Sequence, residues 1–368
     1  MTSKTTRPRF SAILSLSVVA MLTTGGMLYA GPLDPPAGPI VSTGKTLTEV
    51  EPRIAINQIN TPGTANATFR ITQPGSYYLT SNLVGEVGKS GIEVSVVGGT
   101  LNGGVTIDLN GFEIRGTGTA GGGSGDGIRM TVFENNLIIR NGTVRGWAGD
   151  GIDLTAVLAP SCIITDICSK QNGLAGVSTS TSTSITKCVF SENGGIGLAT
   201  SSGCVITASV ASSNGQDGFL LGSGSTITGC TAYLNTGDGI RVNLGCTVSD
   251  CTSYANTGDG IEASVGSVIT NNTCRTNGFN AGNGAGIHIT GEDNRVEGNN
   301  CAAADRGIDV DVAGNFITRN TCAGNTVNWD VVAGNVILVV NAATAGAVTG
   351  NAGGTAPGST DPNANFSY

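Results

Sequence analysis

The stretch that decides the fold is residues 235–261, NTGDGIRVNLGCTVSDCTSYANTGDGI, in which the hexapeptide Asn-Thr-Gly-Asp-Gly-Ile occurs twice, 21 residues apart. Its glycine followed by an apolar residue marks the same place along most of the chain. From Gly176 to Gly260 this marker recurs at every 21st residue; the next step, to Gly286, is 26 residues, and the step to Gly307 is again 21. A fixed period of this length is typical of a solenoid built of repeated coils.

Apolar residues alternate with mostly polar residues after each marker glycine. One column, a residue after the glycine, contains Ile128, Ile152, Val177, Leu198, Phe219, Ile240, Ile261, Ile287, Ile308 and Trp329. A second column contains Ile185, Ile206, Ile227, Val248, Ile269, Val296 and Ile317. Period-two alternation is typical of half-buried strands, so each coil contains at least two of them. We therefore predict an all-β parallel solenoid of nine or ten coils with about 21 residues per coil, stacked about 4.8 Å apart.

The first 30 residues resemble an export signal. Three basic residues precede the apolar run 10–22, and small residues end at Ala30. This arrangement predicts a signal peptide cleaved after Ala30, because the apolar run is short for a membrane span; an uncleaved anchor is the alternative. We expect a secreted, periplasmic or cell-surface protein with no transmembrane segment after cleavage.

The remaining chain is expected to contain one domain with two ends of different composition. Residues 31–90 begin with several prolines and are predicted to be an N-terminal cap. Residues 91–340 are predicted to be the parallel β-helix, and residues 341–368 a C-terminal cap or tail. Caps are expected because the ends of a solenoid would expose unpaired strand edges.

The charge of the chain disfavours two classes of partner. Removing three basic and no acidic residues with the signal peptide changes 18 basic and 26 acidic residues to 15 and 26, a net charge of −11. Nucleic acids and anionic membranes both favour clusters of lysine and arginine. We therefore expect neither as a partner; a polysaccharide, a cation, or no such partner is compatible with this charge. The oligomeric state is not predicted.

The turns Asn235–Ile240 and Asn256–Ile261, with the entry segments Val105–Phe112 and Asn141–Thr143, resemble those of secreted bacterial right-handed parallel β-helix proteins of the pectate-lyase-like superfamily. The resemblance implies a single-stranded right-handed β-helix over roughly residues 91–340. That superfamily includes pectate lyases, polygalacturonases, alginate epimerases, phage tailspikes and a copper-maturation protein, so the fold does not imply one function. The Gly-His-Gly and double-Asp motifs of polygalacturonases, the Asp-Pro-His motif of epimerases and the arginine signature of pectate lyases are absent. The resemblance therefore implies no catalytic residue.

The ten cysteines have two interpretations. Cys188, Cys230 and Cys251 share a column with serine and asparagine, and Cys168, Cys274, Cys301 and Cys322 are assigned to an inward position that alanine or serine occupies in other coils. Such exchange is typical of small core residues and favours free thiols. Disulfides between the stacked pairs Cys230–Cys251 and Cys301–Cys322 are the alternative, since neighbouring strands bring Cα atoms within bonding range.

Aspartates precede the marker glycine in three successive coils, at Asp217, Asp238 and Asp259. Aspartate is common in turns because its carboxylate accepts backbone hydrogen bonds. Closely spaced carboxylates are also the ligands that Ca²⁺ prefers. The column is therefore either turn chemistry or a cation site. We expect no cofactor other than, in the second case, Ca²⁺.

An outward column of the first strand combines charged residues with the one histidine of the chain. Arg241, Glu262, His288 and Asp309 follow one another in successive coils, and Asp311 lies in the next outward column. The insertion within residues 278–284 borders this face. Paired carboxylates with histidine or arginine suit acid–base chemistry on sugars, so the first four are candidate catalytic residues and Asp311 a candidate substrate ligand. The alternative is an ordinary solvated face.

Another outward column contains Tyr233, Tyr254 and Arg275, again at steps of 21 residues. These flat side chains are candidate substrate ligands that stack on sugar rings, or they pack on one another.

These features support three hypotheses. A regular solenoid without a catalytic signature favours a non-catalytic protein that binds glycans or serves the cell surface. The charged face favours a polysaccharide lyase or glycoside hydrolase that acts on an extracellular polymer. The aspartate column favours a cation-handling protein. We expect the first hypothesis to hold, with the enzyme as its main alternative.

Overall fold

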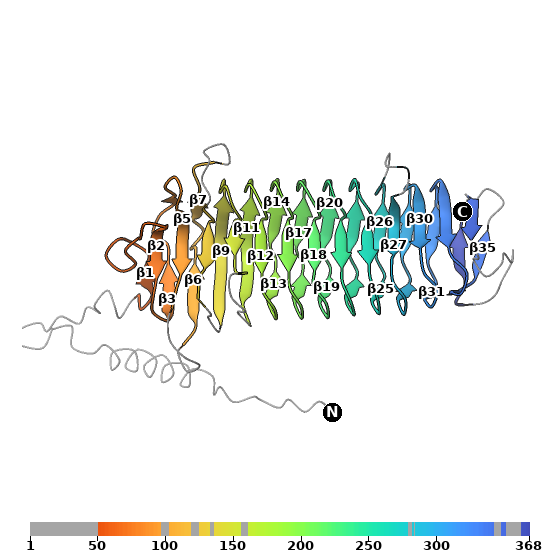
Figure 1. The fold of residues 1–368 in the computed structure, drawn as a ribbon, viewed down its shortest axis with the longest axis horizontal. Helices are drawn as coiled ribbons and strands as arrows, with labels where there is room; N and C mark the ends of the chain where they lie inside the picture. Colours follow the sequence, from red (N-terminus) through yellow and green to blue (C-terminus); the bar gives the residue numbers. More distant parts are fainter. Residues whose placement is uncertain are drawn as a thin grey trace, which may run out of the picture. The chain divides into compact units, whose positions relative to one another are not determined.

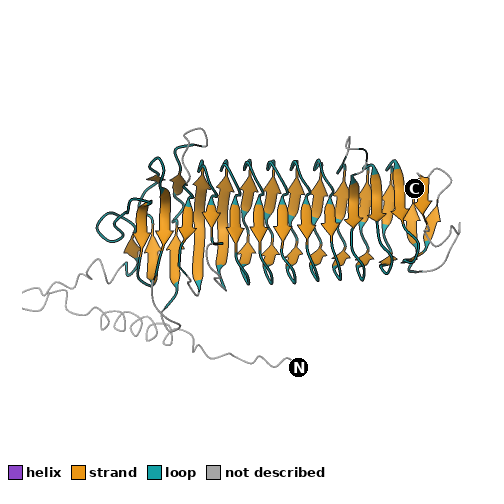
Figure 2. Cartoon of the chain, in the orientation of Figure 1, coloured by secondary structure: helices purple, strands orange, loops and turns teal. Residues whose placement is uncertain are grey.

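The computed structural model of the chain describes residues 51–96, 103–118, 125–132, 136–155, 161–278, 282, 284–341, 347–350 and 362–368. Every regular element in these residues is a strand (Figure 2). The strands belong to one compact unit, Arg53–Tyr368, and follow one another in sequence order along its axis (Figure 1). The predicted signal peptide lies outside the described residues. Among those residues, no helix is long and apolar enough to cross a bilayer.

One strand of each coil lies in a parallel sheet of 13 strands. The register follows the sequence repeat, because Ile240 pairs with Phe219 in the preceding coil and with Ile261 in the following one. The strands of this 13-stranded sheet are β2 (Ala67–Ile71), β5 (Ser90–Val94), β8 (Ile128–Met130), β10 (Ile152–Asp153), β12 (Val177–Thr179), β15 (Leu198–Thr200), β18 (Phe219–Leu221), β21 (Ile240–Val242), β24 (Ile261–Ala263), β27 (Ala285–Ile289), β30 (Arg306–Val310), β33 (Val327–Val331) and β36 (Ala347–Gly350).

The other strands form a 24-stranded sheet that runs as two ladders, joined because the long strands β9 (Leu137–Arg145) and β11 (Ile163–Lys170) take part in both. The other members of the first ladder are β1 (Ile54–Ala55), β3 (Gly75–Tyr78), β6 (Val105–Asp108), β13 (Ser184–Thr186), β16 (Val205–Thr207), β19 (Thr226–Thr228), β22 (Thr247–Ser249), β25 (Val268–Thr270), β28 (Arg295–Glu297), β31 (Phe316–Thr318) and β34 (Val336–Ile337). Those of the second ladder are β4 (Leu83–Val84), β7 (Glu113–Arg115), β14 (Val189–Ser191), β17 (Val210–Ser212), β20 (Thr231–Tyr233), β23 (Thr252–Tyr254), β26 (Thr273–Arg275), β29 (Asn300–Ala302), β32 (Thr321–Ala323), β35 (Val339–Asn341) and β37 (Asn365–Ser367).

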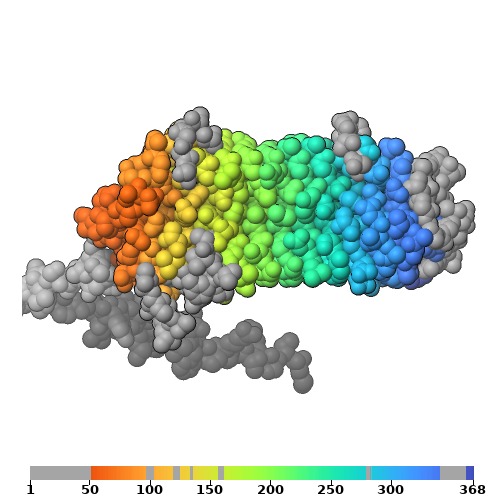
Figure 3. All heavy atoms as spheres, in the orientation of Figure 1, coloured from red at the N-terminus to blue at the C-terminus, as the bar shows by residue number. Residues whose placement is uncertain are grey.

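The prediction of a parallel solenoid is confirmed, with more strands and coils than the sequence repeat showed. Each regular coil has three strands, and the third was missed because its inward residues are small, as at Ala211, Ala232 and Ser253. The 13-stranded sheet exceeds nine or ten coils because β2, β5 and β36 lie outside the glycine-marked repeat of residues 127–329. Successive coils form bands in sequence order along the unit (Figure 3).

The core consists of inward columns from all three ladders. Residues such as Ile240, Ile227 and Phe219 have no exposed surface, and Phe190 and Phe219 meet edge to face at 6.2 Å between ring centres. Each aliphatic or aromatic side chain buried in this way contributes roughly 1.5–3 kcal/mol of transfer free energy. Because each coil covers the inward residues of its neighbours, stacking creates the core.

The marker glycine permits this stacking. A Cβ atom at Gly239 would lie 2.7 Å from the side-chain nitrogen of Asn256 in the next coil. A heavy atom cannot be accommodated at that distance without displacing the asparagine. The repeat that identifies the fold in the sequence therefore reflects a close approach between neighbouring coils.

A buried ladder of asparagines follows the second ladder of strands. The Oδ1 atom of Asn235 accepts hydrogen bonds from the backbone N–H and the side-chain amide of Asn214, at 3.1 and 2.9 Å. Its Nδ2 atom donates to the carbonyl of Ala211 at 3.2 Å. The same bonds recur at Asn193 and Asn256. Buried turn amides of one coil are thus satisfied by the next coil, as buried polar groups require.

All ten cysteines are free thiols. Cys274, Cys301 and Cys322 form an inward column of β26, β29 and β32, as predicted. The assignment of Cys168 to this column is wrong by one residue: Ser169 occupies the inward position opposite Phe190, and Cys168 pairs with Val189. The long strand β11 has no marker nearby to fix its register, which is why the sequence alone misplaced it.

The two ends continue the pairing of the solenoid. Within the predicted N-terminal cap, β2 already pairs in parallel with β5. In the predicted C-terminal segment, β37 pairs with both β32 and β35, so it occupies the second ladder between them. Whether these segments protect the ends as caps stays a prediction.

Candidate functional site

The candidate catalytic residues lie on the outward face of the 13-stranded sheet in the predicted order. Arg241 of β21 pairs with Glu262 of β24, Glu262 with His288 of β27, and His288 with Asp309 of β30. Parallel pairing without a register shift therefore turns a 21-residue spacing, and one of 26, into a continuous row. The structure brings these four side chains together on one face.

Arg241 is neutralised by acidic groups at one end of the row. Its guanidinium contacts the carboxylates of Asp238 and Glu262, each at 2.9 Å, and approaches Asp217 at 3.9 Å. Burial raises the pKa of Asp238 to about 7, although Arg241 and the backbone N–H of Asp259 oppose the shift. The arginine is thus engaged in a local ion-pair network.

His288 bridges two carboxylates from neighbouring coils. Its Nδ1 atom lies 2.9 Å from Oδ2 of Asp259, and its Nε2 atom lies 3.0 Å from Oδ2 of Asp311. The hydrogen bond with Asp259 is the main reason that the pKa of His288 rises to about 9, against the effect of burial. The imidazole is therefore protonated at neutral pH and donates to both carboxylates, so it is not available there as a general base.

Asp309 is buried beside the histidine. Its side chain is 10% exposed and lies 3.5 Å from the guanidinium of Arg306, which also contacts Asp330 at 3.0 Å. Burial raises the pKa of Asp309 to about 6, although His288 and Arg306 oppose the shift. Arg306 was not among the sequence-predicted residues. Its signal was available, because Arg306 pairs with Ala285 and Ala285 follows the turn aspartates in their column.

The predicted aspartate column takes part in turn hydrogen bonds. Oδ1 of Asp217 accepts the backbone N–H of Asp238 at 2.8 Å, and Oδ1 of Asp238 accepts that of Asp259 at 2.7 Å. Oδ1 of Asp259 accepts the N–H of Ala285 at 2.6 Å. These bonds favour the turn interpretation, since one oxygen of each carboxylate already binds the next coil. A cation site on the column stays a prediction.

The predicted aromatic column lies on a different face, the outward side of the second ladder. Tyr233, Tyr254 and Arg275 pair in successive strands, and all three side chains are exposed. Among the described residues, the two tyrosine rings make no contact with each other and neither hydroxyl has a hydrogen-bond partner. The interpretation that this column packs on itself is therefore not supported. The tyrosines are separate from the histidine row, because each coil turns between the two sheets.

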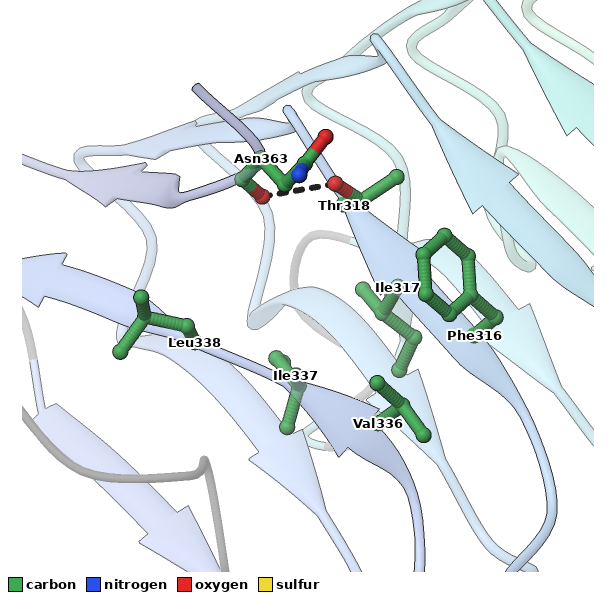
Figure 4. A pocket seen from close by; sticks show the side chains of 7 residues that line it. All are labelled: Phe316, Ile317, Thr318, Val336, Ile337, Leu338 and Asn363. Atoms are coloured by element: carbon green, nitrogen blue, oxygen red, sulfur yellow. Dashed lines mark hydrogen bonds between the residues drawn. The ribbon is translucent and has the colours of Figure 1, made fainter. Parts of the chain in front are cut away.

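Pockets at the C-terminal end and near the N-terminus lie away from both rows. The first has a volume of about 230 Å³ and is formed by β31, β34 and Asn363, where Asn363 accepts a hydrogen bond from Thr318 (Figure 4). The second, of about 320 Å³, is lined by residues between Ile56 and Val84. Neither contains a candidate site residue, so the candidate sites are surface rows.

Known proteins resemble this chain in fold. Residues 172–352 match the family described as the right handed beta helix region. The A-module of mannuronan C-5 epimerase from Azotobacter vinelandii is 13% identical with a TM-score of 0.50, over 73% of this chain and 87% of the module. The Dettilon tailspike protein is 14% identical with a TM-score of 0.52, over 77% of this chain and 59% of the tailspike. No curated protein sequence matches significantly. The chain is a right-handed parallel β-helix, and these likenesses concern the fold alone.

Proposed function

We propose that this right-handed parallel β-helix protein is exported and binds an extracellular polysaccharide without cleaving it. The observation that carries the proposal is the pair of exposed tyrosines, Tyr233 and Tyr254, on adjacent strands of the second ladder. Their rings are 37% and 46% exposed. Tyrosine combines an apolar ring with a polar hydroxyl, which suits the faces and edges of sugar rings.

The surroundings of the two tyrosines also suit a glycan. Leu234 beside Tyr233 is 54% exposed, which extends the apolar surface. Arg275 continues the column and makes no ion pair or hydrogen bond among the described residues. Its guanidinium is therefore available to donate hydrogen bonds to hydroxyl or carboxylate oxygens of a ligand.

Threonines line the second outward column of the same strands. Thr231, Thr252 and Thr273 pair in register beside the tyrosines. Their hydroxyls can donate and accept hydrogen bonds. A row of hydroxyls parallel to a row of rings gives an extended surface, as a linear polymer requires, rather than a cavity for a small molecule.

The state of the charged row supports binding without cleavage. A general base needs a free lone pair at the operating pH, whereas His288 has both nitrogens engaged and a pKa of about 9. Arg241 is occupied by Asp238 and Glu262. These groups stabilise one another in the absence of any ligand.

Affinity electrophoresis of the purified chain through gels containing neutral or uronic-acid polysaccharides tests this proposal. We expect at least one polymer to retard the wild-type protein and the Tyr233→Ala/Tyr254→Ala variant to lose that retardation. Phe316→Ala is the matched control, since Phe316 is an exposed aromatic residue on the first ladder. Equal retardation of wild type and the double tyrosine variant would refute the assignment of the binding surface.

A polysaccharide lyase or glycoside hydrolase is the second candidate, and one observation favours it. The buried carboxyl of Asp309, with its pKa raised to about 6, lies beside His288 and can retain a proton for a leaving group more readily than an ordinary aspartate. In that case Arg241, Glu262, His288 and Asp309 would be the catalytic row and Asp311 a substrate ligand. The His288→Ala/Asp309→Ala variant should then lose any polymer-cleaving activity that the wild type shows; full activity in this variant would exclude the row.

A further inference from the structure

We propose that His288, Asp309 and Asp311 form a binding site for a divalent transition-metal ion such as Zn²⁺ or Co²⁺, with Asp259 as a positioning residue for the imidazole. The three ligands come from two adjacent coils. His288 pairs directly with Asp309 across β27 and β30, and Asp311 follows β30 two residues after Asp309. This site differs from the aspartate column that the sequence indicated for Ca²⁺.

The donor atoms are close enough to share one ion. One ligand atom from each of His288, Asp309 and Asp311 lies within 4.8 Å of the others. Nε2 of His288 and Oδ2 of Asp311 are 3.0 Å apart, a separation that two ligands of one ion adopt when each bond is about 2.0–2.2 Å. Paired strands fix His288 opposite Asp309, and ligands on strands are held more precisely than ligands on loops.

Asp259 gives the histidine the support that metal-binding imidazoles usually have. Nδ1 of His288 donates to Oδ2 of Asp259 at 2.9 Å, and Oδ1 of Asp259 is held by the N–H of Ala285 at 2.6 Å. A carboxylate on one ring nitrogen orients the ring and strengthens the other nitrogen as a ligand. The second nitrogen, Nε2, faces Asp309 and Asp311. When an ion binds, it replaces the proton on Nε2, and that proton passes to solvent.

The donor set and the exposure define the kind of ion. Imidazole nitrogen suits zinc and cobalt, whereas Ca²⁺ and Mg²⁺ prefer oxygen ligands alone. The side chain of Asp311 is 58% exposed and that of His288 is 21% exposed, so the site opens to solvent. Three protein ligands leave at least one coordination position for water or another small ligand. Arg306 lies 3.5 Å from Asp309 and opposes the ion, but it also binds Asp330 at 3.0 Å, so it can remain paired when Asp309 turns to a metal.

The composition of the chain makes a direct experiment simple. His288 is the single histidine in the sequence, so an imidazole ligand can come from nowhere else in an untagged chain. We would titrate the purified, metal-free chain with Co²⁺ and follow its visible absorption, and repeat the titration with Zn²⁺ by calorimetry. We expect one ion per chain in both titrations.

Three variants and a control test the assignment. His288→Ala and Asp309→Asn should abolish saturable binding. Asp259→Asn retains Oδ1 for Ala285 but loses the acceptor for Nδ1, so it should weaken binding by about 10–100-fold with an unchanged melting temperature. Asp153→Asn, in the same outward column of the distant strand β10, should bind like the wild type.

Two outcomes would overturn the proposal: absence of saturable Co²⁺ and Zn²⁺ binding by the wild type, or equal binding by His288→Ala. Circular dichroism of each variant excludes loss of the fold as the cause of lost binding. The result is independent of the glycan experiment, because the tyrosine column lies on another face.

Discussion

The coils of β12, β15 and β18 and the coils of β27, β30 and β33 share one fold but present different chemistry to solvent. In the first group the outward residues at the centre of each strand are Ser178, Ala199 and Leu220, without charge. In the second group the corresponding column contains His288, Asp309 and Asp330. The inward columns remain apolar in both groups. The comparison teaches that inward residues and turns determine the solenoid, while outward residues are free to vary with function.

Removing a large inward side chain should have the greatest effect, and a similar one in both regions. Phe219→Ala in β18 and Trp329→Ala in β33 both delete fully buried rings. We expect each to lower the free energy of unfolding by about 3–5 kcal/mol, through lost burial and the remaining cavity. Urea unfolding of both variants measures this. A loss below about 1 kcal/mol at only one position would show that the two regions are not equivalent inside.

The asparagine ladder should be the next most sensitive feature. Asn235→Ala leaves the backbone N–H and side-chain amide of Asn214 without their acceptor, at a cost of about 1–3 kcal/mol for each unsatisfied buried group. Asn243→Ala, at an exposed position of the same coil, serves as the control and should change little. If both variants unfold at the same urea concentration as the wild type, the ladder does not stabilise the coils.

The charged region should show a pH dependence that the uncharged region lacks. The pKa of His288 is raised to about 9 from a usual value near 6.5, so its contribution to stability is complete below about pH 6.5 and is lost as the pH rises through 9. The single histidine allows a direct measurement of its ring protons by NMR. We expect titration near pH 9, and the stability difference between wild type and His288→Gln to shrink from pH 6.5 to pH 10. Titration near pH 6.5 would show that Asp259 and Asp311 do not hold the imidazolium.

The smallest effect is expected in the aspartate column. Asp238→Asn retains an oxygen that accepts the N–H of Asp259, whereas Asp238→Ala loses it and should cost about 1 kcal/mol more. If the column serves the turns, added Ca²⁺ or a chelator should leave the melting temperature unchanged. A rise with Ca²⁺ that Asp238→Asn abolishes would establish the cation site instead.

The sequence sufficed for the solenoid because a one-residue column repeats ten times, and each repeat confirms the others. It also placed Arg241, Glu262, His288 and Asp309 in one row, since parallel pairing in register preserves the order of a repeat. It could not show that His288 lies between Asp259 and Asp311, because that depends on side-chain direction across neighbouring coils. It missed the third strand of each coil for a related reason: small inward residues such as Ala211 give no apolar signal.

The measurement that tests the account most directly is size-exclusion chromatography of neutral and uronic-acid polysaccharides after incubation with the purified chain. We predict that at least one polymer co-elutes with the protein and keeps its original length, because the tyrosine surface binds it and the acid–base groups of the histidine row are engaged with one another. A polymer that becomes shorter would contradict the account and identify the protein as an enzyme. Absence of co-elution with every polymer would contradict the proposed glycan binding.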